Sequence, residues 1–212
     1  MQMSLRDGLR SRLLTMVKKK VRSMMKGIAG AIHSMGFTPN SVSVVGLLLA
    51  VLSASLYCLA QRDELLVPIA AALFFLSGFL DVIDGLMAEL FDESSSFGGV
   101  LDSLSDRYAD ALVICGIILG GLCDLSWGLT ALVGSILVSY VRARAEAADV
   151  KMESVGLMER AERMLVIVAA SLLFLVNHAS ISYSIVLIAV LTHLTVLQRM
   201  LYLLKTTSTG AS

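Results

Sequence analysis

Four aspartates form two pairs whose spacing suits a shared site. Asp81 and Asp84 are three residues apart, and Asp102 and Asp106 are four apart. Each spacing places both members of a pair on one face of a helix. Because only the short connection 90–97 separates the two segments, we expect two antiparallel neighbouring helices on which the four carboxylates converge.

A cluster of four carboxylates needs a bound cation to offset its negative charge. Carboxylates at membrane depth cost several kcal/mol each, and bringing four together adds mutual repulsion. Oxygen ligands with no nearby His or Cys favour Mg²⁺, Mn²⁺ or Ca²⁺ over zinc. Mg²⁺ leaves several of its positions to water or substrate phosphates, so two such ions would clamp a diphosphate. The expected cofactor is therefore a pair of Mg²⁺ or Mn²⁺ ions.

Glycines accompany both acidic pairs. Gly85, Gly98 and Gly99 remove side chains where a nucleotide or phosphate must approach the backbone closely. Two structural alternatives exist, because small residues also allow tight helix packing and acids at helix ends can be solvated at the membrane interface. Two pairs at helical spacing with glycines at matching places favour the ligand site.

The elements that position these residues are predicted to be membrane helices. The chain has 212 residues, of which 57% are hydrophobic and 16% charged, with a mean hydropathy of +0.82, which is too apolar for an ordinary soluble domain. A crossing needs about 20 mostly apolar residues. Six crossings are expected, from uncharged runs at 41–60, 65–80, 111–123, 125–141 and 164–198. The run 111–123 extends backward through Asp106 and Asp110. The run 164–198 is long enough for two crossings, with a turn at Asn177-His178-Ala179-Ser180.

Cations are distributed unevenly. The first 35 residues contain eight Lys or Arg and one acid, with apolar residues at helical spacing between them. This pattern predicts an amphipathic helix on the membrane surface that contacts membrane lipid, or a helix packed on the ends of the bundle.

With six crossings, only Arg62 of 17 cations lies on the far side, so the termini and the site should be cytoplasmic in the cell membrane. The expected domains are a juxtamembrane helix over 1–36, a membrane domain over 37–205 and a flexible tail over 206–212.

The acidic stretch resembles the signature of the CDP-alcohol phosphotransferase family, D-x2-D-G-x2-A-R-x8-G-x3-D-x3-D. The matching residues are Asp81, Asp84, Gly85, Ala88, Gly98, Asp102 and Asp106. One position departs from the pattern, because Glu89 stands where the family has an arginine that helps to hold the donor phosphates.

This resemblance implies a fold and a set of roles. The fold is an all-α integral membrane protein with six transmembrane helices, holding two metal ions on Asp81, Asp84, Asp102 and Asp106. Asp106 would also be the general base, the catalytic residue that takes the proton of the attacking hydroxyl. The cytidine diphosphate would be bound by Asn40, Asp81, Gly85, Ala88 and Gly98. Asn40 could equally be a helix cap.

A second region indicates the acceptor. Arginines bracket the loop between the fourth and fifth predicted crossings, and guanidinium groups bind phosphate bidentately, although neighbouring glutamates could pair with them instead. The pattern S-Y-x-[KR]-A-R-A-E followed by G-x-x-E-R-x-E-R resembles the phosphatidylinositol-phosphate and archaetidylinositol-phosphate synthase branch of the family. By that resemblance, the acceptor phosphate would be bound by Ser139, Arg142, Arg160, Arg163 and Arg199.

The expected function is metal-dependent transfer of a phosphatidyl-type group from CDP-archaeol or CDP-diacylglycerol to inositol 1-phosphate, with release of CMP. Alternatives with the same chemistry take glycerol 3-phosphate or serine as acceptor, or CDP-inositol as donor. Alternatives of another class are a cation transporter that uses the intramembrane carboxylates and a non-catalytic homologue, the latter suggested by Glu89. A homodimer is implied by the resemblance, and no nucleic acid is expected as a partner.

Overall fold

The computed structural model describes residues 23–152 and 155–209, and this part of the chain is helical, without strands. Most of the predicted amphipathic helix over 1–36, including seven of its eight cations, lies outside the described residues, as do the last three residues of the tail. Residues 23–34 are helical and are followed by α2 Pro39–Cys58, α3 Leu66–Leu90, α4 Ser96–Leu119, α5 Leu125–Glu146, α6 Arg160–Leu173 and α7 Ser180–Thr209.

Side-chain caps fix where three of these helices begin. Thr38 and Ser41 form a reciprocal capping box at the start of α2, with Pro39 in the first turn. Ser95 accepts a hydrogen bond from the Gly98 N–H at the start of α4, and Asp124 caps α5 in the same way. The alternative in which Asn40 serves as the cap is therefore wrong, because Thr38 has that role and Asn40 lies inside α2.

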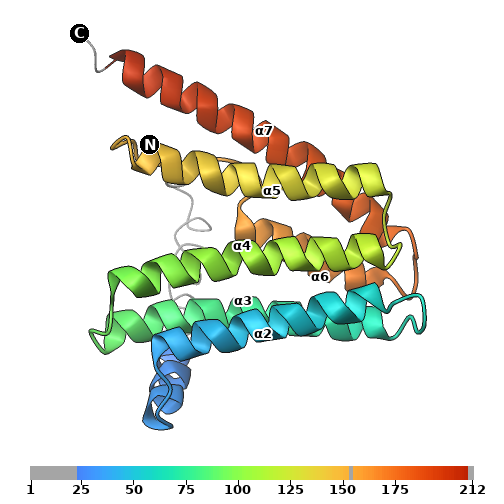
Figure 1. Ribbon diagram of the computed structural model, residues 1–212, viewed down its shortest axis with the longest axis horizontal. Helices are drawn as coiled ribbons and strands as arrows, with labels where there is room; N and C mark the ends of the chain where they lie inside the picture. Colours follow the sequence, from blue (N-terminus) through green and yellow to red (C-terminus); the bar gives the residue numbers. More distant parts are fainter. Residues whose placement is uncertain (1–22, 153–154, 210–212) are drawn as a thin grey trace, which may run out of the picture.

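The helices run alongside one another in a bundle (Figure 1). α2 packs against both α3 and α4, while α5 packs against α7 and α6 contacts α3 and α7. α3 and α4 are connected by a short loop and run antiparallel, as expected, but each contacts α2 far more than it contacts the other. Large buried side chains such as Tyr57, Phe74 and Ile185 fill the centre. The two acidic pairs thus face each other beside α2.

Four of the described helices are long and apolar enough to cross a membrane: α2, α3, α5 and α7. α4 has 24 residues, but Asp102, Asp106, Arg107 and Asp110 make it too charged to qualify by composition. α6 has only 14 residues, or about 21 Å at about 1.5 Å per residue. The chain is a membrane protein with four clear spanning candidates.

The helical residues 23–34 cross the direction of the bundle near the start of α2 (Figure 1). Ala29 is buried there with Val42 of α2 and with Ile83 and Met87 of α3. His33 stacks on the ring of Phe91 with 3.7 Å between ring centroids and lies 3.0 Å from Glu93. This segment therefore packs on the end of the bundle that contains the acidic pairs.

Candidate active site

Three of the four aspartates form a tight cluster. One carboxylate oxygen from each of Asp81, Asp102 and Asp106 lies within 4.8 Å of the others. Asp84 is instead 3% exposed, and the Ser43 hydroxyl donates to its Oδ2 at 2.5 Å. All four aspartates nevertheless line one small cavity with Ser43, and this carboxylate cavity lies between α2, α3 and α4.

The donor set fits a divalent cation. Two oxygens bound to one Mg²⁺ lie at most about 4.2 Å apart, since each bond is about 2.1 Å long. Oxygens in adjacent positions on the ion lie about 3.0 Å apart, so the three carboxylate oxygens would approach one another by up to about 2 Å to share it. Among the described residues, the buried Oδ1 of Asp106 has no hydrogen-bond partner, although Arg160 Nη1 lies 2.8 Å away at an unsuitable angle. This buried oxygen has a guanidinium beside it but no hydrogen bond, so it keeps a lone pair that a cation can use.

Arg160 contacts this cluster directly. Its Nη1 donates to Asp81 Oδ2 at 2.6 Å and lies 2.8 Å from Asp106 Oδ1. Arg160 is the first residue of α6, so α6 begins at the level of the carboxylates and not at the end of the bundle. Its guanidinium lies between the carboxylates and the other arginines.

A second cavity, of about 170 Å³, opens on one side of the carboxylates. Its lining includes four residues predicted to bind the nucleotide, and we call it the glycine cavity: Asn40, Gly85, Ala88 and Gly98. A methyl group on Gly98 would lie 2.9 Å from Asn40 Oδ1, whereas one on Gly85 would meet no described atom within 4 Å. Helix packing therefore accounts for the absence of a side chain at Gly98 but not at Gly85. The fifth predicted nucleotide contact, Asp81, lines the carboxylate cavity instead.

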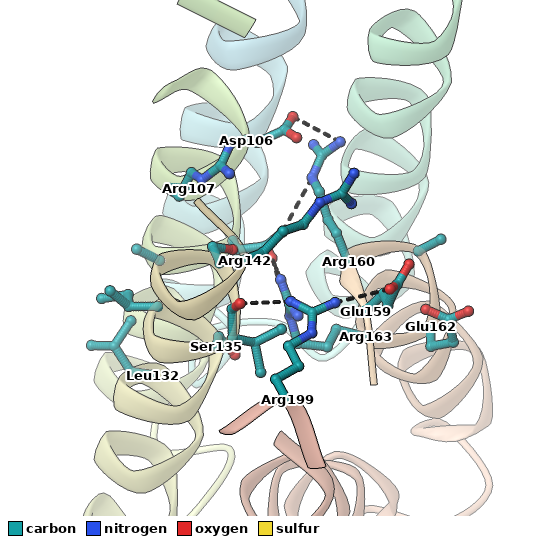
Figure 2. A pocket seen from close by; sticks show the side chains of 16 residues that line it. Asp106, Arg107, Leu132, Ser135, Arg142, Glu159, Arg160, Glu162, Arg163 and Arg199 are labelled. Atoms are coloured by element: carbon teal, nitrogen blue, oxygen red, sulfur yellow. Dashed lines mark hydrogen bonds and ion pairs between the residues drawn. The ribbon is translucent and has the colours of Figure 1, made fainter. Parts of the chain in front are cut away.

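A third cavity, of about 200 Å³, lies on the other side of the carboxylates. Every residue predicted to bind the acceptor phosphate lines it, and we call it the arginine cavity: Ser139, Arg142, Arg160, Arg163 and Arg199. Figure 2 shows Arg142, Arg160, Arg163 and Arg199 converging from α5, α6 and α7. Residues that are up to 60 positions apart in the chain, and that the sequence prediction had grouped, therefore line one cavity.

The arginines differ in how they are bonded. Arg163 is 4% exposed, and its Nη2 donates to Asp110 Oδ2 at 2.6 Å. Arg199 is 1% exposed and donates to two backbone carbonyls and to Glu159. Arg142 lies on the exposed surface of α5, where its Nε is 2.9 Å from Glu146. Arg142 and Arg160 are therefore better placed to meet a ligand than Arg163 or Arg199.

The three cavities form a continuous series. Asp84, Asp102 and Ser43 line both the glycine cavity and the carboxylate cavity. Asp106 and Arg160 line both the carboxylate cavity and the arginine cavity. A diphosphate, a metal site and a phosphate can therefore occupy adjacent positions.

Two residues that contact the candidate site were absent from the predicted set. Asp110 lines the arginine cavity and binds Arg163, and it continues the four-residue spacing of Asp102 and Asp106, which was an available signal. Ser43 holds Asp84, and it lies three residues after Asn40 on the same face of α2. Glu89, at the position of the family arginine, is exposed on α3 beside Ala88.

Comparison with known proteins agrees with this geometry. Residues 37–197 match the family model for CDP-alcohol phosphatidyltransferase. The chain is 35% identical over 189 residues to archaetidylinositol phosphate synthase of Pyrococcus horikoshii, covering 88% of this chain and 94% of the relative. It is 44% identical over 133 residues to the enzyme of the same name from Methanothermobacter thermautotrophicus, covering 62% and 68%.

Solved structures show the same fold. The structure of Mycobacterium tuberculosis phosphatidylinositol phosphate synthase with CDP-DAG bound has a TM-score of 0.74 and 26% identity, covering 85% of this chain and 94% of that one. The complex of that protein with manganese and citrate has a TM-score of 0.73, at 26% identity and with 84% and 88% coverage. From the aspartate spacing, the linked cavities and the matched family model, the chain belongs to the CDP-alcohol phosphatidyltransferase family and is a phospholipid-synthesising, divalent-metal-dependent transferase.

Proposed function

We propose that this protein transfers a phosphatidyl-type group from a CDP-linked lipid to inositol 1-phosphate and releases CMP. The observation that supports this most is the series of three cavities, with aspartates between a glycine-lined hollow and an arginine-lined one. The glycine cavity would hold the cytidine diphosphate, and the arginine cavity would hold the phosphate of the acceptor. The reacting hydroxyl then lies at the carboxylates.

The protein's own residues have distinct parts in this reaction. The acceptor hydroxyl oxygen forms a bond to the lipid-side phosphorus while the bridging P–O bond of the diphosphate breaks, and CMP leaves with the bridging oxygen. Asp106 accepts the hydroxyl proton, a contribution of about 10²- to 10⁴-fold. Asp81 and Asp102 would hold the cations beside the diphosphate, and Asn40 contacts the nucleotide beside Gly98.

Two ions, Mg²⁺ or Mn²⁺, are proposed. One would be held by Asp81, Asp102 and Asp106, and the other on the Asp84 side of the carboxylate cavity. When bound, such ions neutralise charge on the phosphoryl oxygens and on the departing CMP. Ser43 keeps the carboxylate of Asp84 oriented.

The donor is proposed to be CDP-archaeol. The two archaeal relatives named above are 35% and 44% identical to this chain, whereas the bacterial structures are 26% identical. CDP-diacylglycerol, the lipid bound in one similar structure, is the other donor to test. Inositol 1-phosphate is favoured as acceptor because the relatives are named for inositol phosphate products and because the arginine cavity suits a phosphate. A serine acceptor would give the arginines no phosphate to bind, whereas glycerol 3-phosphate would.

Six crossings are proposed for the membrane domain over 37–205. α4 is long enough, and its charges face the carboxylate and arginine cavities. α6 can be short because the segment 155–159 lies against α7 and places Arg160 at the level of Asp81. The termini and the site are placed on the cytoplasmic side, since among the described loops at the opposite end only 59–65 contains a cation, Arg62. A homodimer remains a prediction.

The proposal is tested by CMP release from the purified full chain. CDP-archaeol and CDP-diacylglycerol are combined in turn with inositol 1-phosphate, glycerol 3-phosphate and serine, with Mg²⁺, with Mn²⁺ or with EDTA. We expect release with inositol 1-phosphate that EDTA abolishes. Equal or greater release with glycerol 3-phosphate would overturn the acceptor assignment, and release that persists in EDTA would overturn the metal assignment.

A matched pair of arginines on α5 tests the acceptor site. Arg142 lines the arginine cavity, whereas the exposed Arg144, two residues later, does not. We expect Arg142→Ala to raise the KM for inositol 1-phosphate by about tenfold, as loss of a charged hydrogen bond would, and Arg144→Ala to leave it unchanged. Equal effects of the two substitutions would contradict the placement of the phosphate.

A further inference from the structure

We propose that Thr195, in the middle of α7, is a positioning residue that holds the segment 155–159 and thereby places Arg160 at the carboxylates. The inference rests on the proposed function, in which Arg160 lies between the acceptor phosphate and the metal ligands. Thr195 does not line the arginine cavity. It would act only through the segment that it binds.

The side chain of Thr195 is fully buried, and its hydroxyl both accepts and donates hydrogen bonds. Its Oγ1 accepts hydrogen bonds from the backbone N–H groups of Leu157 at 3.2 Å and Met158 at 3.1 Å. The same hydroxyl donates to the Leu191 carbonyl within α7 at 2.7 Å. One buried hydroxyl thus satisfies two consecutive N–H groups of a loop that has no regular structure of its own.

Arg199, one turn further along α7, holds the two ends of the same segment. Its Nε donates to the Val155 carbonyl at 2.7 Å, and its Nη2 donates to Glu159 Oε1 at 2.9 Å. Its Nη1 donates to the Val138 carbonyl on α5 at 2.6 Å. Thr195 and Arg199 therefore form a contiguous strip on α7 against which 155–159 lies.

The contact is close enough to require a glycine. Gly156 has φ +132°, and a Cβ there would lie 2.4 Å from Thr195 Cγ2. The segment therefore lies directly on the methyl group of Thr195. Any side chain at this position would move the segment away from α7.

The start of α6 depends on this strip because α6 has no cap of its own. The N-cap residue Glu159 makes no side-chain hydrogen bond to the helix, and its carboxylate binds Arg199 instead. The next residue is Arg160, whose guanidinium contacts Asp81 and Asp106. A misplacement of about 1 Å at a reacting site can cost about 10²-fold in rate, so the strip controls how well Arg160 meets the acceptor.

The experiment replaces Thr195 by valine, which keeps its shape but removes the hydroxyl, and by serine, which keeps the hydroxyl. The direct readout is amide hydrogen exchange of the peptide that contains Leu157 and Met158 in the full chain. We expect exchange to quicken at least about tenfold in Thr195→Val, since two hydrogen bonds are lost, and to stay near wild type in Thr195→Ser. Thr206→Val, an exposed threonine on α7 with a comparable hydroxyl bond to Tyr202, is the matched control.

Kinetics supply the second readout. Thr195→Val should raise the KM for inositol 1-phosphate by about tenfold and leave the KM for the CDP-lipid unchanged. Thr195→Ser should keep both KM values near those of the wild type. Gly156→Ala, which disturbs the same contact from the side of the loop, should reproduce the effect if the valine variant does not fold.

Each outcome has a separate meaning. Unchanged exchange at Leu157 and Met158, or an equal rise in both KM values, would overturn the role of Thr195. Wild-type protein that releases no CMP with inositol 1-phosphate would instead overturn the proposed function, and hydrogen exchange would still decide whether Thr195 holds the segment.

Discussion

At the scale of residues, Asp84 is set apart from the other three aspartates. It is held by Ser43 in a buried position, while Asp81, Asp102 and Asp106 face one another. A carboxylate fixed by a neighbouring hydroxyl is oriented before a ligand arrives. The two helical pairs in the sequence are therefore not two equal halves of the site.

The first prediction concerns Asp106. Asp106→Asn should lower kcat by about 10²- to 10⁴-fold, because an amide cannot accept the hydroxyl proton. Asp92→Asn, in the exposed loop after α3, is the control and should retain activity, since asparagine tolerates the positive φ of 55° found there. Undiminished CMP release by Asp106→Asn would exclude this residue as the base.

The second prediction concerns Gly85. Alanine there would meet no described atom within 4 Å and favours a helix by about 0.5 to 1 kcal/mol. We expect Gly85→Ala to keep or raise the thermal stability while raising the KM for the CDP-lipid by about tenfold or more, because the methyl group enters the glycine cavity. Gly30→Ala, also in a helix with open space around it, should leave the KM unchanged.

The residues of the site were predictable where their spacing followed helical periodicity. The aspartates and Gly98 could be placed in this way, and the family pattern added Asn40. Bonding partners could not be predicted, because they depend on which helices meet. Thus Asp110 binds Arg163, and Ser43 binds Asp84, through contacts between segments 53 and 41 residues apart in the chain.

At the scale of elements, α6 differs most from the sequence prediction. Uncharged runs predicted where α2, α5 and α7 lie, and the turn at 177–180 is confirmed by the start of α7 at Ser180. α6, however, begins four residues before the apolar run and ends at Leu173. Hydropathy does not indicate this start, because Arg160 and Arg163 are neutralised by Asp81, Asp106 and Asp110 on other helices.

The third prediction concerns the link between α4 and α6. Asp110 and Arg163 are both buried and lie 2.6 Å apart. Arg163→Ala leaves Asp110 with the longer ion pair to Arg160 Nε at 3.7 Å and should cost about 3 kcal/mol of stability, the lower end of the range for a broken buried pair. The measurement is the unfolding midpoint in detergent. Arg142→Ala removes an exposed pair with Glu146 and should cost less than about 1 kcal/mol.

The same pair provides an internal check. Adding Asp110→Asn to Arg163→Ala removes the carboxylate that has lost its closer partner, so the double variant should be more stable than Arg163→Ala alone. A double variant that is still less stable would mean that packing, and not charge, limits this contact.

At the scale of the whole molecule, polarity is concentrated at one end of the bundle. The loop 91–95 and the described residues 147–152 lie at that end, while the loops 59–65, 120–124 and 174–179 lie at the other (Figure 1). The four aspartates lie in the second half of α3 and the first half of α4, toward the loop 91–95. Between the two ends, α2, α3, α5 and α7 are apolar enough to cross a membrane.

The fourth prediction tests the orientation. In a variant whose three free cysteines, Cys58, Cys115 and Cys123, are replaced by alanine, single cysteines are introduced by Asp92→Cys or Arg62→Cys. A membrane-impermeant maleimide should label position 62 in right-side-out vesicles and position 92 only in inverted ones. The reverse pattern would invert the proposed topology.

The late start of α6 has a consequence for the bilayer. Because Arg160 meets the carboxylates partway along the bundle, a water-soluble acceptor can reach the reacting bond without entering the hydrocarbon. Under the proposed function, every new headgroup is therefore added in a single leaflet, the one that faces the supply of inositol phosphate. The product lipid then reaches the opposite leaflet only by moving its charged headgroup across the bilayer.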